Sequence, residues 1–132
     1  MIFVDSSAVV AILAADPDAA ALAAKLESDA ERISAGHVIV EASMRLASLF
    51  GVAPAAADGL VTRLLREAAI SVVPITEDIG HAAVAAFDRY GRGRGAGNLN
   101  FGDCLSYACA KAHGARLLFK GHDFSQTDVV GA

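Results

Sequence analysis

Four acidic residues of this chain occupy positions from which a carboxylate could bind a cation. Three of them lie next to predicted strand ends or helix starts, and the fourth interrupts an apolar helix. They are Asp5, Glu41, Asp103 and Asp123. In an open parallel sheet, ligands bind in the crevice beyond the carboxyl ends of the strands. Carboxylate oxygens placed there are the ligand type that suits hard divalent cations.

Each of these acids also has a purely structural explanation. The segment Asp5–Ser7 can shape a turn and cap a helix, and Asp123 can form an Asx turn. Asp103 in a first helical turn is stabilised by the helix dipole. Glu41 can pair with Arg45 one turn further along, an exposed ion pair worth on the order of a few tenths of a kcal/mol. The spacing alone does not choose between ion pair and ligand.

Length and composition limit the class of protein. With 132 residues, we expect one domain that buries roughly two thirds of its unfolded surface. The hydrophobic fraction of 55% indicates apolar surface reserved for a partner or a second copy. The net charge of -4 argues against coating nucleic acid through bulk positive charge, but it does not exclude a nuclease. No apolar run is long enough to span a bilayer, and Asp5 interrupts the start where a secretory signal would carry a basic residue and then an apolar core, so a cytoplasmic protein is expected.

The order of predicted elements is that of a parallel α/β sheet. We expect strands over residues 2–4, 31–34, 70–75 and 115–119. We expect helices over residues 8–13, 17–28, 37–50, 54–69 and 77–90, and a sixth that Gly114 closes. Asp16 is the expected N-cap of the second helix, with Pro17 at its first position. Cys104 and Cys109 lie on one predicted helix with a spacing that prevents a bridge, so we expect both to be reduced.

The segment Gly91–Gly97 has the composition of a mobile loop and carries Arg92 and Arg94. It lacks the GxGxxG placement and a Walker lysine, so it is not a nucleotide-binding loop. Two interpretations remain open: a solvated connection, or a loop whose arginines contact an RNA backbone.

Taken together, these motifs resemble those of the PIN-domain ribonucleases, and more narrowly the VapC-type toxins of toxin-antitoxin pairs. The resemblance covers essentially the whole chain. It rests on Ile2–Ser7, the helix bearing Glu41, Asn100–Cys104 and Leu117–Phe124. One departure is His122, where these toxins commonly carry Asn. The fold implied is a single PIN-like α/β domain over residues 1–132, a three-layer sandwich with a central, mostly parallel sheet flanked by helices.

The resemblance implies a metal-dependent endoribonuclease that is the toxic component of a type II pair. Asp5, Glu41, Asp103 and Asp123 would line one pocket and hold one or two Mg2+ or Mn2+ ions. The first three would hold the principal ion, and Asp123 a second ion or the attacking water. Water would attack an RNA phosphodiester in line and leave 5'-phosphate and 3'-hydroxyl ends.

Further roles and partners follow from the same resemblance. Ser6 is expected to orient a carboxylate or water, and Arg92, Arg94 and Lys120 to contact phosphate. His122 is not expected to be a ligand, and Asp128 is expected to be a surface residue. The implied partners are RNA, a cognate antitoxin and a second copy of the chain in a homodimer, with no membrane.

Crowded carboxylates have a physical consequence that can be checked. Two of them ~4 Å apart repel by about 4 kcal/mol at an effective dielectric of 20. We therefore expect one or more raised pKa values without metal, and stabilisation by Mg2+ or Mn2+. Two other functions remain: a phosphoacceptor or phosphatase-type α/β domain, and a catalytically inactive PIN-like binding module.

Overall fold

Four parallel strands form the centre of the molecule in the order β3-β2-β1-β4. The computed structural model describes residues 1–132. Phe3 of β1 is aligned with Ile33 of β2 on one side and with Leu117 of β4 on the other. The strands are β1 Ile2–Val4, β2 Arg32–Ala35, β3 Ser71–Val73 and β4 Arg116–Leu118. The prediction of a mostly parallel sheet is confirmed.

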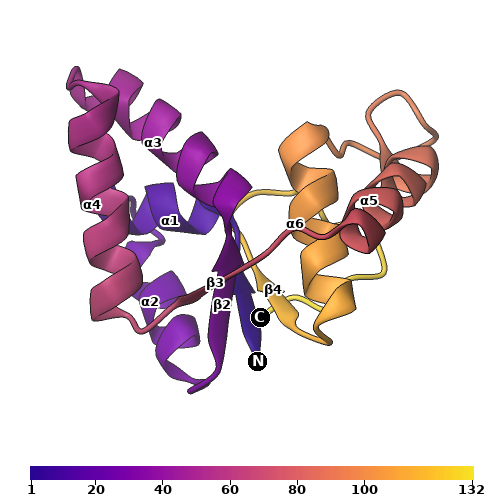
Figure 1. The fold of residues 1–132 in the computed structure, drawn as a ribbon, viewed down its shortest axis with the longest axis horizontal. Coiled ribbons are helices and arrows are strands. Elements are labelled where there is room, and N and C mark those ends of the chain that lie inside the picture. The colour runs from indigo at the N-terminus through magenta and orange to yellow at the C-terminus, as the bar shows by residue number, and fades with distance from the viewer.

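Six helices cover the two faces of this sheet and make the molecule three-layered, as predicted (Figure 1). Helices α1 to α4 lie on one side, and α5 and α6 lie on the other. Both termini lie near the sheet. The helices are α1 Ser6–Leu13, α2 Ala19–Glu27, α3 Gly36–Phe50, α4 Pro54–Glu67, α5 Glu77–Tyr90 and α6 Phe101–Ala112.

Strand β1 is the most deeply buried element. Ile2, Phe3 and Val4 have no exposed surface, because β2 and β4 flank the strand and helices cover both of its faces. A buried strand of this kind is a continuous apolar run instead of an alternating one. The residue that leaves it, Asp5, therefore emerges from the middle of the sheet.

Local sequence signals set several helix ends. Gly51 ends α3 in the left-handed conformation with φ of 63°, and Thr76 caps α5 by accepting a hydrogen bond from the backbone N–H of Ile79. Both residue types are favoured at these positions. Cys104 and Cys109 are free and buried, as predicted.

The predicted start of the second helix was wrong. Helix α2 begins at Ala19 and its N-cap position is Asp18, not Asp16. The Asp16 carboxylate instead accepts the backbone N–H of Asp18 in a turn and pairs with the Lys120 ammonium. A long-range ion pair thus occupies the side chain that the sequence pattern assigned to the cap. No helix has the length and hydropathy needed to cross a bilayer.

Candidate functional site

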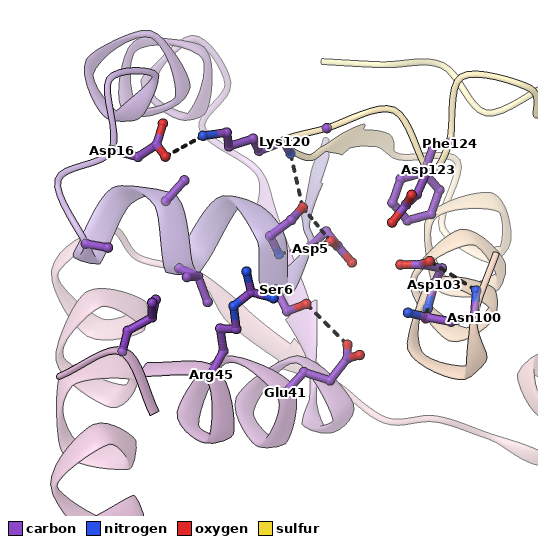
Figure 2. Close-up of a pocket in the computed structure, with 16 residues that line it drawn as sticks. Asp5, Ser6, Asp16, Glu41, Arg45, Asn100, Asp103, Lys120, Asp123 and Phe124 are labelled. Carbon is purple, nitrogen blue, oxygen red and sulfur yellow. Dashed lines mark hydrogen bonds and ion pairs between the residues drawn. The ribbon is translucent and has the colours of Figure 1, made fainter. Parts of the chain in front are cut away.

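One cavity of about 620 Å³ brings together all four acids singled out in the sequence (Figure 2). Asp5 follows β1 and Asp123 lies beyond β4, while Glu41 comes from α3 and Asp103 from α6. Ser6 and Lys120 also line the cavity. Segments up to 118 residues apart in sequence therefore meet at the carboxyl end of the central strand, where parallel sheets bind ligands.

Asp5 is fixed by the start of α1 and still keeps one oxygen free. Its Oδ2 accepts hydrogen bonds from the backbone N–H of Ser7 at 3.0 Å and from the Ser7 hydroxyl at 2.7 Å. The Ser7 hydroxyl accepts in turn from the backbone N–H of Lys120 at 3.0 Å, which connects the end of β4 to Asp5. The other oxygen, Oδ1, is buried without any hydrogen-bond partner. An unpaired buried carboxylate oxygen is costly, and a bound cation would satisfy it.

Glu41 points into the cavity and forms no ion pair with Arg45 (Figure 2). Its Oε1 accepts a hydrogen bond from the Ser6 hydroxyl at 3.2 Å. Its carboxylate also lies against the backbone of Gly102, where an added Cβ would come within 2.1 Å of Oε2. The Ser6 hydroxyl on α1 and the backbone at Gly102 on α6, which carries no side chain, thus define the position of the Glu41 carboxylate.

Asp103 is held by the first turn of α6. The Asn100 side chain accepts the backbone N–H of Asp103, and the Asp103 carboxylate accepts the backbone N–H of Asn100, which completes a capping box. The pKa of Asp103 is raised to about 7, chiefly by burial; the charges of Asp5, Asp123 and Glu41 add to the rise, and the hydrogen bond from the Asn100 N–H opposes it. Burial and then the Asp5 charge also raise the pKa of Glu41. The expected rise in pKa is present, with burial as its largest cause.

Asp123 connects the cavity to the glycine-rich loop. Its Oδ1 accepts a hydrogen bond from the Asn98 amide at 2.7 Å, and the Asn98 oxygen accepts from Arg92 Nε at 3.3 Å. Arg94 pairs with Asp88 at 3.2 Å instead. Neither arginine lines the cavity.

Lys120 lines the cavity but already has partners. Its ammonium pairs with Asp16 and lies 3.8 Å from Asp18. Asp128 lies outside the lining and accepts a hydrogen bond from the Tyr107 hydroxyl and another from Lys111 at 3.2 Å. Asp128 therefore anchors the C-terminal segment to α6. His122 does not line the cavity.

The donor set of the cavity fits a hard divalent cation. It offers carboxylate oxygens and no cysteine or histidine, and Asp5 supplies an oxygen without a partner. As the side chains stand, no three acids converge closely enough to form a ready-made metal cluster. Metal binding would thus require side-chain movements.

Sequence reasoning missed several residues that shape the cavity. Ser7 and Asn98 donate to carboxylates, Gly102 makes room for Glu41, and Arg45 lines the cavity without an ion pair. The Asp-Ser-Ser turn was a usable signal for Ser7. Gly102 lies within the Asn100–Cys104 motif and Arg45 was named as a partner of Glu41, but their roles in the cavity, like that of Asn98, depend on contacts between distant segments.

Comparisons with known proteins identify the family. The PIN domain model matches residues 2–130. The ribonuclease VapC30 of Mycobacterium tuberculosis is 39% identical over 127 residues, which cover 96% of this chain and 95% of that protein. The ribonuclease VapC of Mycolicibacterium smegmatis is 40% identical over 127 residues, 96% of each chain.

Solved structures show the same fold. The VapC20 toxin of Mycobacterium tuberculosis, described as cleaving the sarcin-ricin loop, aligns with a TM-score of 0.78 at 21% identity over 100% of this chain and 98% of its own. A toxin-antitoxin complex from Klebsiella pneumoniae aligns with a TM-score of 0.71 at 17% identity, covering 100% and 97% of the two chains. The family match and the sequence relatives replace the phosphoacceptor interpretation as the family assignment. The chain belongs to the PIN-domain family and, within it, to the VapC ribonucleases.

Proposed function

We propose that this ribonuclease is a Mg2+- or Mn2+-dependent endonuclease whose active site is the four-acid cavity. The observation that carries the proposal is that Asp5, Glu41, Asp103 and Asp123 line one cavity, in which Asp5 also has a buried carboxylate oxygen without a hydrogen-bond partner. Repulsion between these charges would be relieved by a cation. We treat residues 1–132 as one functional domain, since one buried core connects all of the elements.

Each acid has a proposed role. Asp5, Glu41 and Asp103 would hold the principal ion, and Asp123 a second ion or the attacking water. A bound Mg2+ supplies charge neutralisation at the phosphate and lowers the pKa of water. Ser6 orients Glu41 through its hydrogen bond, and Asn98 orients Asp123.

The substrate-contacting roles of Arg92, Arg94 and Lys120 remain part of this proposal. Arg92 reaches the site only through Asn98, and Lys120 would have to exchange Asp16 for a phosphate. Arg94 could engage RNA only at the periphery, because it is paired with Asp88. Lys120 is therefore the strongest of the three, because it already lines the cavity.

The biological role we propose is that of the toxin in a type II toxin-antitoxin pair acting in the cytoplasm. The named relatives are VapC ribonucleases, and one structural neighbour is a toxin-antitoxin complex. A cognate antitoxin and a homodimer are the proposed partners. Apolar side chains exposed on α3, such as Val40 and Met44, supply surface for such contacts.

The test is to incubate the pure protein with total RNA, with Mg2+ or with chelator, and to map the new 5' ends. We expect discrete cuts with 5'-phosphates in Mg2+ and none in chelator. Asp5→Asn should abolish the cuts while circular dichroism and melting show an intact fold. Equal RNA integrity in Mg2+ and chelator would instead favour the catalytically inactive PIN-like module.

A further inference from the structure

Arg45 is a cation in the candidate active site that has no assigned partner or role. Only two cationic side chains, Arg45 and Lys120, line the cavity. Lys120 is paired with Asp16 and Asp18. Arg45 takes part in none of the ion pairs or side-chain hydrogen bonds of the molecule.

The position of Arg45 on α3 determines toward which part of the cavity its side chain extends. Arg45 lies four residues after Glu41 on α3, so both side chains project from the same face, one helical turn apart. Figure 2 shows the Arg45 side chain extending from α3 toward Ser6 at the start of α1. The lining also includes the apolar side chains of Val10, Ala14 and Leu49. The cavity thus combines carboxylates, apolar side chains and a guanidinium.

The ion pair that would make Arg45 purely structural does not form. Glu41 is the acid with the correct helical spacing, but its carboxylate is directed to Ser6 and Gly102. The guanidinium therefore keeps its planar set of five N–H donors free, and this geometry matches a phosphate better than an ammonium does. A free guanidinium beside four carboxylates also lowers the repulsion that RNA would meet on approaching the cavity.

We propose that Arg45 binds the RNA phosphodiester next to the scissile one and so sets the path of the strand through the cavity toward α1. The ligand class is single-stranded RNA, because a cationic group and apolar side chains line the same cavity and can receive a phosphate and an unpaired base together. This inference rests on the proposed nuclease function and adds a substrate contact to it. Arg45 is an RNA-binding residue here and has no part in holding metal.

The test measures binding separately from cleavage. The probe is a short fluorescein-labelled single-stranded RNA, titrated by anisotropy in chelator between about 50 and 200 mM salt. We expect Arg45→Ala to weaken binding by about tenfold and to reduce the salt slope by about 0.7, the loss of one phosphate contact. The RNA affinity of Arg45→Lys should lie between those of the wild type and Arg45→Ala, since lysine keeps the charge and lacks the planar donor set.

Arg66→Ala is the matched control. Arg66 is also an exposed helical arginine without an ion pair, but it lies on α4 outside the cavity. Its removal should leave affinity and salt slope unchanged. Melting curves of all variants, with and without Mg2+, establish that the fold and any metal effect are retained.

Cleavage assays then locate the effect. We expect Arg45→Ala to raise KM for RNA and to change kcat little, since the contact is made before the reaction. Wild-type affinity and salt slope in Arg45→Ala would overturn the inference, even where the wild type cleaves RNA. Absence of Mg2+-dependent cleavage by the wild type would overturn the proposed function instead, so the two failures are distinguishable.

Discussion

At the scale of single residues, the candidate site places carboxylates where burial and neighbouring negative charges disfavour their ionised form. Asp103 is the clearest case, because burial and three neighbouring carboxylates raise its pKa to about 7. Its unfolded value is near 3.8. Between these values, the folded chain holds a proton that the unfolded chain has released. Without metal, stability should therefore fall as the pH rises from about 4 to about 7.

Asp103→Asn should remove this pH dependence and raise the melting temperature of the metal-free protein. The gain at about pH 8 is at most about 4 kcal/mol, reduced by solvent at the cavity mouth. It should shrink toward pH 4, where the wild-type carboxyl is protonated in both states. The amide oxygen can still accept the Asn100 backbone N–H, so the helix cap is retained.

RNA cleavage by Asp103→Asn should fall by more than about 100-fold. Calorimetry at several pH values with parallel cleavage assays checks both effects, and a variant less stable than wild type at pH 8 would refute the charge argument.

Gly102→Ala should displace the Glu41 carboxylate, because the new Cβ would lie 2.1 Å from its Oε2. Backbone φ at Gly102 does not require glycine, so the expected loss is in activity and metal stabilisation more than in fold. We expect cleavage to drop by about 10- to 100-fold. The control is the double variant with Glu41→Asp, whose shorter side chain restores room. Cleavage and the Mg2+-dependent melting shift should both recover in part, and a double variant worse than both single variants would argue against a steric cause.

At the scale of elements, short sequence signals explain where helices begin and end. The capping box at α6 has a second consequence, because it holds Asp103 by the same bonds that start the helix. Asp5 likewise caps α1 while it faces the cavity. Two of the four acids are thus positioned by helix caps, which explains why their structural and functional interpretations could not be separated by residue type.

Asn100→Ala should destabilise the protein by about 1 kcal/mol, the usual cost of losing an N-cap side chain. The Asp103 backbone N–H would lose its acceptor. Asn100→Ser is the control, since a hydroxyl can accept the same bond. Urea denaturation should show the alanine variant unfolding earlier and the serine variant close to wild type. Equal midpoints for wild type and alanine would mean that solvent replaces the cap without cost.

At the scale of the whole molecule, a cation that binds only the folded cavity must stabilise the fold. Saturating Mg2+ or Mn2+ should raise the melting temperature by about 5 °C. The rise should be larger above pH 7 than at pH 5.5, because Asp103, with its pKa of about 7, must lose its proton to bind the ion. Ca2+ and Na+ at matched ionic strength separate specific binding from screening. A shift that is the same in Asp5→Asn would show that the ion binds elsewhere.

Exposed apolar surface on α3 predicts self-association. Met44 is 66% exposed and Val40 is 57% exposed on this helix. The apolar stripe on α4 is less available, because Val61 and Leu65 are buried in the core. Met44→Glu should shift the protein toward a monomer, measured by light scattering after size exclusion.

Val84→Glu is the comparison for this experiment, since Val84 is 68% exposed but lies on α5, on the other side of the sheet. We expect it to leave the mass unchanged. Loss of the dimer in Val84→Glu but not in Met44→Glu would place the interface on α5.

The sequence by itself determined the order of strands and helices, several helix ends and the set of four acids, because these depend on periodicity, capping chemistry and motifs within short segments. Tertiary structure decided which groups these side chains contact. Glu41 faces Ser6 and Gly102 and not Arg45. Asp16 pairs with Lys120 and does not cap the second helix as predicted. Such choices arise when parallel crossovers bring segments far apart in sequence to one edge of the sheet, where burial and neighbouring charge outweigh the local preferences that a short pattern can express.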